Sequence, residues 1–285
     1  MTPREEQLRA EICEVGRRVY ARGYVASNDG NISVRLDDHH LLATPKSVSK
    51  GFMTPDMMVV TDMQGSKVSG HRDPSTELKM HLAVYEMRPD VRAVVHAHPP
   101  LSTGFAVAGV PLNKSSLAEM IFSLGSVPIA EYATPSTQEL PDAVKRYITA
   151  HDGLLLANHG ALTAGQDLMN AYFKMETMEH FAQITLVARQ LGGENLISRQ
   201  EVQRLQGLRD FYGIKSPAPI CTDPALAGSE GGTCQFVDAP ASDGPRIVAP
   251  AAGLSGAGEG GEIRLTYREL AALIADAVRQ VTRDA

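Results

Sequence analysis

The sequence predicts an α/β protein in which helices cover a mixed sheet. Short apolar, β-branched runs typical of strands alternate along the chain with amphipathic helical segments. Past residue 215 this alternation stops, and Pro, Gly, Ala, Ser and Asp dominate the sequence. Such a composition cannot bury enough apolar surface to fold. We therefore expect one folded domain over 1–215, a flexible linker over 216–262 and an amphipathic helix over 263–285.

The first 111 residues alternate helical and strand-like segments, separated by turn residues. The expected elements are a helix over 4–22, strands over 32–36, 41–44 and 57–62, a helix between the turns 74–77 and 88–90, a strand over 92–95, a short helix over 101–107 and a hairpin at 109–111. The strand over 92–95 runs directly into His96.

The rest of the domain continues the alternation. We expect a helix over 115–124, a strand over 126–132, a helix over 137–150, a buried strand over 153–157 and helices over 167–191 and 198–211. In the long helix, the stripe expected to face the core contains Met169, Phe173, Met178, Phe181 and Ile184.

Composition excludes several classes of protein. The 285 residues are 43% hydrophobic and 21% charged, with a net charge of −6 and scattered Lys and Arg, so nucleic acid is not an expected partner. No apolar run approaches the roughly 20 residues of a membrane helix. The charged, helical N-terminus does not resemble a signal peptide, which predicts a cytoplasmic protein. Three cysteines make no disulfide framework.

Three histidines are candidate metal ligands. His96 and His98 are separated by one residue at a strand, so they point to the same side of the sheet. His159 follows a later buried strand, and sites in α/β proteins lie at strand ends. Three His ligands leave one position open on Zn²⁺, which is the catalytic arrangement, and the ion could polarise a carbonyl or enediolate oxygen. A lone His-x-His pair would be weak evidence.

An acid/base candidate and an anion-binding turn precede the histidines. The Pro-Ser-Thr-Glu turn opens a helix, whose free backbone N–H groups bind anions, and its last residue, Glu77, could transfer a proton beside the metal. Ordinary readings remain open. Ser75 and Thr76 could be helix caps alone, and Gly30 and Asn31 could form only a turn.

Taken together, these motifs resemble the class II aldolase/epimerase family over about residues 4–215. The motifs are GNISVR over 30–35, TP at 44–45, PSTE over 74–77, VHAH over 95–98, NHG over 158–160 and FYG over 211–213. The resemblance implies a three-layer α/β/α domain with a central, mostly antiparallel or mixed sheet that assembles as a homotetramer.

The resemblance also assigns roles to individual residues. It implies one zinc or other divalent ion per subunit, held by His96, His98 and His159, with Glu77 as the acid/base. The substrate phosphate would be bound by Gly30, Asn31, Ser75 and Thr76, with Lys46 and Ser47 at the other phosphate-loop positions. Tyr212 would reach a neighbouring subunit's site from the tail.

The implied reaction is zinc-dependent cleavage of a ketose 1-phosphate, such as fuculose 1-phosphate or a similar deoxyketose phosphate. The products would be dihydroxyacetone phosphate and a small aldehyde, lactaldehyde or acetaldehyde. Glu77 favours the aldolases, because the related 4-epimerases carry Asp there. The loop over 44–47 reads Thr-Pro-Lys-Ser where the family has Thr-Pro-Thr-Gly, and Glu119 replaces a family tyrosine, which leaves the aldehyde open. The alternatives are an epimerase, dehydratase or decarboxylase on the same site, or a non-enzymatic binding module like the adducin head.

The C-terminal stretch carries a separate signal. Thr266 and Glu269 have capping-box spacing, and apolar residues recur at helical spacing up to Val281. This helix could fold back onto its own tetramer, or it could dock on another protein. A short amphipathic helix after a linker resembles the encapsulation peptides that direct enzymes into bacterial microcompartments, so shell proteins are candidate partners.

Overall fold

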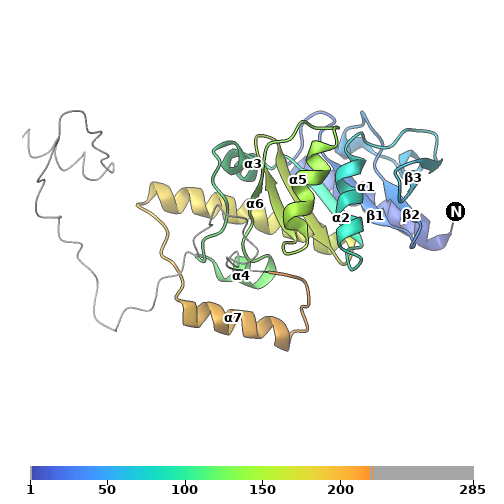
Figure 1. The fold of residues 1–285 in the computed structure, drawn as a ribbon. Coiled ribbons are helices and arrows are strands. Elements are labelled where there is room, and N and C mark those ends of the chain that lie inside the picture. The colour runs from blue at the N-terminus through green and yellow to red at the C-terminus, as the bar shows by residue number, and fades with distance from the viewer. Residues whose placement is uncertain (1, 219, 221–285) are drawn as a thin grey trace, which may run out of the picture. The chain divides into compact units, whose positions relative to one another are not determined.

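The structure is a computed structural model that describes residues 2–218 and Ile220 (Figure 1). The strands are β1 (Asn31–Arg35), β2 (His40–Ala43), β3 (Val59–Asp62), β4 (Lys67–Ser69), β5 (Ala93–Ala97), β6 (Ile129–Ala130), β7 (Gly153–Leu156) and β8 (Gly160–Gly165). The α-helices are α1 (Pro3–Ala21), α2 (Leu78–Met87), α3 (Pro100–Val107), α4 (Ala118–Ser123), α5 (Glu139–Ile148), α6 (Leu168–Gln190) and α7 (Arg199–Phe211). Two short 3-10 helices, η1 (Lys50–Phe52) and η2 (Pro55–Met57), follow β2.

The eight strands form one sheet in the order β4-β3-β2-β1-β5-β8-β7-β6. All neighbouring pairs are antiparallel except β6 and β7, which are parallel. The sheet is therefore mixed and mostly antiparallel, as the sequence predicts. In its centre, β5 pairs with β1 on one side and with β8 on the other.

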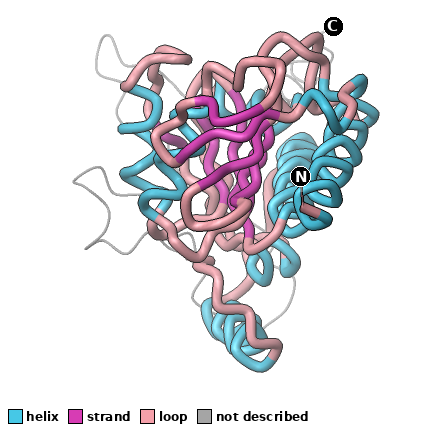
Figure 2. Tube along the Cα trace, turned by 90° about the vertical axis from the view of Figure 1, so that its right-hand side faces the viewer, coloured by secondary structure: helices cyan, strands magenta, loops and turns pink. Residues whose placement is uncertain are grey.

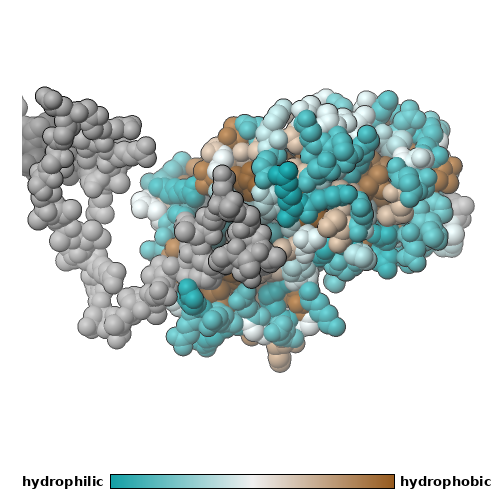
Figure 3. All heavy atoms as spheres, in the orientation of Figure 1, coloured by the Kyte–Doolittle hydropathy of each residue, from teal (hydrophilic) through white to brown (hydrophobic). Residues whose placement is uncertain are grey.

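Helices cover both faces of the sheet and make three layers, as Figure 2 shows. On one face, buried side chains of α1, α3 and α6 form a cluster with the sheet, among them Val15, Phe105 and Met178. On the other face, α2 and α5 bury residues such as Val84 and Val144. The outer surface over α2 and α5 is mainly hydrophilic (Figure 3), as amphipathic helices on a sheet require.

Local sequence explains where α1 and α6 begin. The Thr2 hydroxyl accepts a hydrogen bond from the Glu5 amide at the start of α1, where Pro3 occupies the first turn. Asp167 caps α6 in the same way by accepting from the Asn170 amide. These caps satisfy backbone N–H groups that have no partner within the helix.

Two strands are absent from the sequence prediction, β4 and β8. The omission of β8 matters, because it lies in the centre of the sheet between β5 and β7. Its sequence, GALTAG, consists mostly of small residues, which give a weak strand signal. Its place comes from pairing with two neighbouring strands.

Other expected elements differ in extent. No hairpin forms at 109–111, since Leu112 makes only an isolated bridge to Val127. The helix expected over 115–124 is limited to α4, and the strand expected over 126–132 to the two residues of β6. On α6, Phe173 is 50% exposed and Ile184 is 37% exposed, so the predicted stripe is wrong at both positions. Met178 and Phe181 of the predicted stripe are buried, and the buried face also contains Ala171 and Met175.

The described chain ends beside α7, which packs against α4 (Figure 1). Ile220 is buried with Ile121 and Val202, while most of the expected linker and the helix over 263–285 lie outside the described residues. Among the described helices, none has both the length and the apolar character needed to cross a bilayer.

Candidate metal centre and substrate pocket

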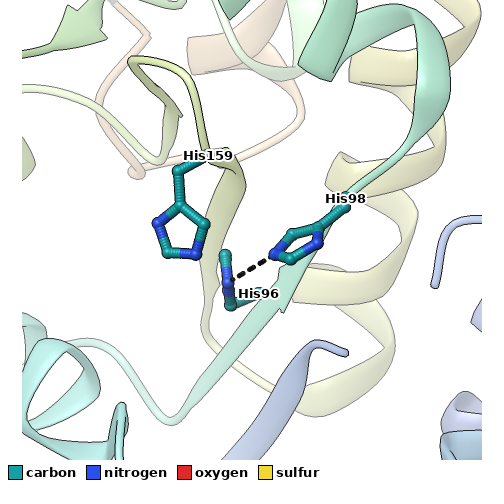
Figure 4. Close-up of side chains that lie close together, drawn as sticks. All are labelled: His96, His98 and His159. Carbon is teal, nitrogen blue, oxygen red and sulfur yellow. Dashed lines mark hydrogen bonds between the residues drawn. The ribbon is translucent and has the colours of Figure 1, made fainter. Parts of the chain in front are cut away.

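The sheet brings the three histidines together. His96 lies in β5, His98 follows the end of that strand, and His159 lies in the turn between β7 and β8. Because β5 pairs with β8, this turn lies beside the end of β5. The three rings point toward one another, with centroids 4.8 to 5.1 Å apart (Figure 4). One nitrogen from each ring can be chosen so that all lie within 4.8 Å of one another.

The hydrogen bonds of the cluster suit a divalent metal ion. His96 Nδ1 lies 2.9 Å from the carbonyl oxygen of Ala161, which can only accept, so Nδ1 carries the proton and Nε2 has a free lone pair. Burial lowers the pKa of His96 to about 3, so its ring is neutral at pH 7. His96 Nε2 and His98 Nε2 are 3.3 Å apart. Two nitrogens at about 2.0–2.1 Å from one tetrahedral zinc would be about 3.3–3.4 Å apart, so the residues fit the ion.

Two glycines permit the close approach at this site. A Cβ on Gly160 would lie 2.6 Å from His98 Cδ2 and 2.7 Å from the Ala97 carbonyl oxygen. Gly30 has a φ of +72°, and a Cβ there would lie 2.8 Å from the His96 carbonyl oxygen. Neither position has space for a side chain, and Gly30 has a backbone conformation that glycine tolerates best.

Glu77 lies directly beside the histidines. Its carboxylate oxygens are 3.1 Å from His159 Nε2 and 3.6 Å from His96 Nε2, and Asn31 Nδ2 donates a hydrogen bond of 2.8 Å. Burial alone would raise the pKa of Glu77. The hydrogen bond from His159, the proximity of His96 and the Asn31 amide together hold that pKa well below its usual range. Glu77 is therefore ionised and lies adjacent to the three histidines.

A pocket of about 230 Å³ opens beside this cluster. Most of the residues predicted from sequence line it: Gly30, Lys46, Ser47, Ser75, Thr76, Glu77, His98 and His159. Asn31 and His96 lie behind them, through their contacts with Glu77. Ser47 has a φ of +59°, a left-handed conformation, at the position where the resembling family carries glycine. The loop thus keeps the glycine-like backbone despite the substitution.

Some residues lie elsewhere, and others had not been anticipated. Tyr212 caps α7, is 66% exposed and packs against Phe122, and it does not line this pocket. Glu119 lies exposed in α4. Asp29 and Lys50 line the pocket but were not identified from sequence. The Asp29 carboxylate is 3.5 Å from His98 Nδ1, where it can orient that ring.

The fold and site thus define an α/β/α protein with a three-histidine centre beside a polar pocket. The profile of the class II aldolase and adducin N-terminal domain matches residues 10–186. The chain belongs to this family, as its motifs predict.

Individual relatives within the family carry out different reactions. The 5-deoxy-D-ribulose 1-phosphate aldolase of Bacillus thuringiensis is 31% identical over 209 residues, 73% of this chain and 98% of that protein. The 3-oxo-tetronate 4-phosphate decarboxylase of Haemophilus influenzae is 31% identical over 178 residues, 61% of this chain and 84% of that protein. A solved structure of L-fuculose 1-phosphate aldolase superimposes with a TM-score of 0.68 at 30% identity, covering 74% of this chain and 98% of that one. This likeness confirms the predicted fold.

Proposed function

We propose that this chain is a divalent-metal-dependent aldolase that cleaves a ketose 1-phosphate, such as fuculose 1-phosphate or a similar deoxyketose phosphate. The products would be dihydroxyacetone phosphate and a small aldehyde such as lactaldehyde. The observation that carries the proposal is the position of Glu77, an ionised carboxylate between His96 and His159 that also lines a pocket with Lys46, Ser75 and Thr76. Similarity to aldolases of two deoxyketose phosphates supports it.

The reaction requires one bond to break and two protons to move. The C3–C4 bond of the ketose breaks, the C4 hydroxyl gives its proton to water as the aldehyde forms, and C3 keeps the electron pair and takes up one proton. A divalent ion held by the three histidines, zinc in our proposal, would stabilise negative charge developing on the substrate oxygens. Glu77 would transfer the proton at C3, and Asn31 holds its carboxylate in place. Lys46, Ser47, Ser75 and Thr76 would bind the phosphate.

A decarboxylase of a phosphorylated sugar acid is the second candidate. Similarity to the Haemophilus influenzae enzyme favours it, since the identity is the same as that to the Bacillus thuringiensis aldolase. Such a reaction would use the same metal ligands and phosphate pocket, but it would release carbon dioxide from the bound acid. The site geometry alone suits both reactions.

An assay of the zinc-loaded full chain separates these candidates. Fuculose 1-phosphate, 5-deoxyribulose 1-phosphate and 3-oxo-tetronate 4-phosphate are supplied in turn, with enzymatic detection of dihydroxyacetone phosphate and of carbon dioxide. Release of dihydroxyacetone phosphate from either ketose supports the aldolase. Carbon dioxide release alone would support the decarboxylase. Metal analysis tests the third possibility, a binding module. That possibility is supported if the purified chain holds less than about one divalent ion per few copies and if His96→Ala does not change its metal affinity.

We also propose that the chain forms a homotetramer in which Tyr212 reaches a neighbouring copy's pocket. Phe211 (80% exposed) and Tyr212 (66% exposed) have ring centroids 5.1 Å apart, and such adjacent exposed rings support an interface there, because contiguous exposed apolar groups mark interaction surfaces. Mass measurement by light scattering tests the assembly. Glu77→Gln and Tyr212→Phe should each lower activity when present alone. If two subunits share each site, mixed tetramers should contain some sites with both native side chains and should regain some activity. Absence of any restored activity in mixed tetramers would contradict sharing.

A further inference from the structure

Lys50 is a buried cation in the wall of the pocket. The residue is 2% exposed, lies in η1 and lines the pocket together with Lys46, Ser75 and Thr76. Helix α1 covers η1 closely, since a Cβ on Gly16 would lie 2.5 Å from the Lys50 carbonyl oxygen. The backbone of Lys50 is therefore fixed by packing, and its side chain reaches toward the pocket loops.

The ammonium group joins the two loops that flank the pocket. Lys50 Nζ donates hydrogen bonds to the carbonyl oxygens of Asn28, at 3.1 Å, and Val48, at 2.7 Å. Asn28 belongs to the turn that leads to Gly30, and Val48 follows Ser47. An ammonium has three N–H groups, and the third has no acceptor among the residues that the structure describes.

Burying an ammonium is unfavourable unless an anion compensates its charge. Within the described part of the chain, no carboxylate forms an ion pair with Lys50. Two neutral carbonyls, with the Asp29 and Glu77 carboxylates acting from further away without forming an ion pair, compensate the charge only in part. Lys50 lines the pocket, and the pocket lining is mainly polar, so an anion bound there could reach the group.

We propose that Lys50 is a second cation of the substrate pocket, which binds the phosphate dianion together with Lys46. Through its hydrogen bonds it would also hold the turn at Asn28 and the loop at Val48 in fixed positions relative to each other. This inference rests on the proposed function, since it assumes a phosphorylated substrate. The two lysines would match the two negative charges of the phosphate. The three histidines, with the ion they would hold, and Glu77 would remain free to act on the reacting carbons.

The charged surroundings of Lys50 predict a pH dependence. Burial lowers its pKa to about 8, although Asp29 and Glu77 oppose the shift. Lys46 lines the same pocket, and Tyr20 of α1 packs against Gly51, next to Lys50. Phosphate binding should therefore weaken as pH rises through about 8 and Lys50 loses its proton.

The test is calorimetric binding of inorganic phosphate to the zinc-loaded full chain between pH 7.5 and 9.5. Wild-type protein should lose affinity about tenfold over this range, and Lys50→Met should bind about ten- to a hundredfold more weakly at pH 7.5 without that loss. Lys50→Arg should retain binding and lose the pH dependence, because arginine stays charged. Lys79→Met, on the exposed side of α2, is the matched control and should behave as wild type.

Each result has one interpretation. If wild type fails to bind phosphate at all, the phosphate pocket of the proposed function is wrong. If wild type binds but Lys50→Met binds equally well, the inference about Lys50 is wrong while the proposed function stands. The wild-type pH profile needs no variant, so it decides even if Lys50→Met does not fold. A flat wild-type profile overturns the inference.

Discussion

Two buried lysines of this protein differ in what compensates their charge. Lys174, in α6, donates to the Asp152 carboxylate and to the Ala164 carbonyl, and Asp152 also accepts a hydrogen bond from Arg88. Lys50 donates only to two carbonyls and lines the pocket. The first lysine is neutralised within the fold and joins three segments of it. The second has no carboxylate in an ion pair with it, only Asp29 and Glu77 further away, which leaves it able to bind an anion in the pocket.

The largest effect on activity is expected at the pocket, from Glu77→Gln. Loss of a general acid/base group should lower kcat about 10³-fold. The thermal midpoint should change little, since glutamine keeps the shape and can still accept from Asn31. Turnover and metal content should be measured together. The metal content should stay the same, because the three histidines remain. Glu86→Gln, on the exposed side of the same helix, is the control. Retained activity in Glu77→Gln would remove Glu77 from the mechanism.

The opposite pattern is expected in the stabilising cluster. Asp152→Asn leaves Lys174 and Arg88 without their buried anion, and breaking such a network should cost about 3–5 kcal/mol of unfolding free energy. Denaturant titration measures this loss. Asp90→Asn removes the exposed partner of the same Arg88 and should cost less than about 1 kcal/mol. Equal losses from the two variants would show that burial does not distinguish these pairs.

A pH titration of stability should identify a third buried group, His81 on α2. Burial lowers its pKa to about 4, and its Nδ1 lies 2.7 Å from the Ser33 hydroxyl. The unfolded chain binds the proton near pH 6.5, so stability present above this pH is lost as pH falls toward 4. Neutral His81 should contribute up to about 3 kcal/mol to the free energy of unfolding. As pH falls toward 4, the difference in unfolding free energy between wild type and His81→Gln should therefore become smaller. Parallel pH profiles would contradict the assignment.

The smallest effect on turnover is expected from removing residues 263–285. Sequence predicts an amphipathic helix there, joined by a long linker, so cleavage should continue at the wild-type rate. If the helix is an encapsulation peptide, which its sequence resembles, co-purification with microcompartment shell proteins should be lost. Loss of the tetramer or of most activity would instead show that the segment supports the folded domain.

Much of the site could be predicted because its residues lie in short motifs. His96 and His98 lie at the end of one strand. The Pro-Ser-Thr-Glu turn predicts a helix start and contains Glu77. Lys50 could not be found in this way. A single lysine in a loop looks solvent-exposed until the packing of α1 against η1 shows that it is buried. Asp29 likewise acquires its contact with His98 only through folding.

The sequence by itself determined the α/β class, the family and the chemical types available to the site, because periodicity and motifs are local properties of the chain. Only the tertiary structure decided how these parts combine. The small-residue segment GALTAG becomes the central strand β8 because β5 and β7 offer it hydrogen-bonding edges. That pairing places His159 beside His96, 63 positions earlier in the chain, at a ring separation of 4.8 Å. Contacts over such separations depend on which strands become neighbours in the sheet, and GALTAG, with its small residues, gives only a weak local strand signal.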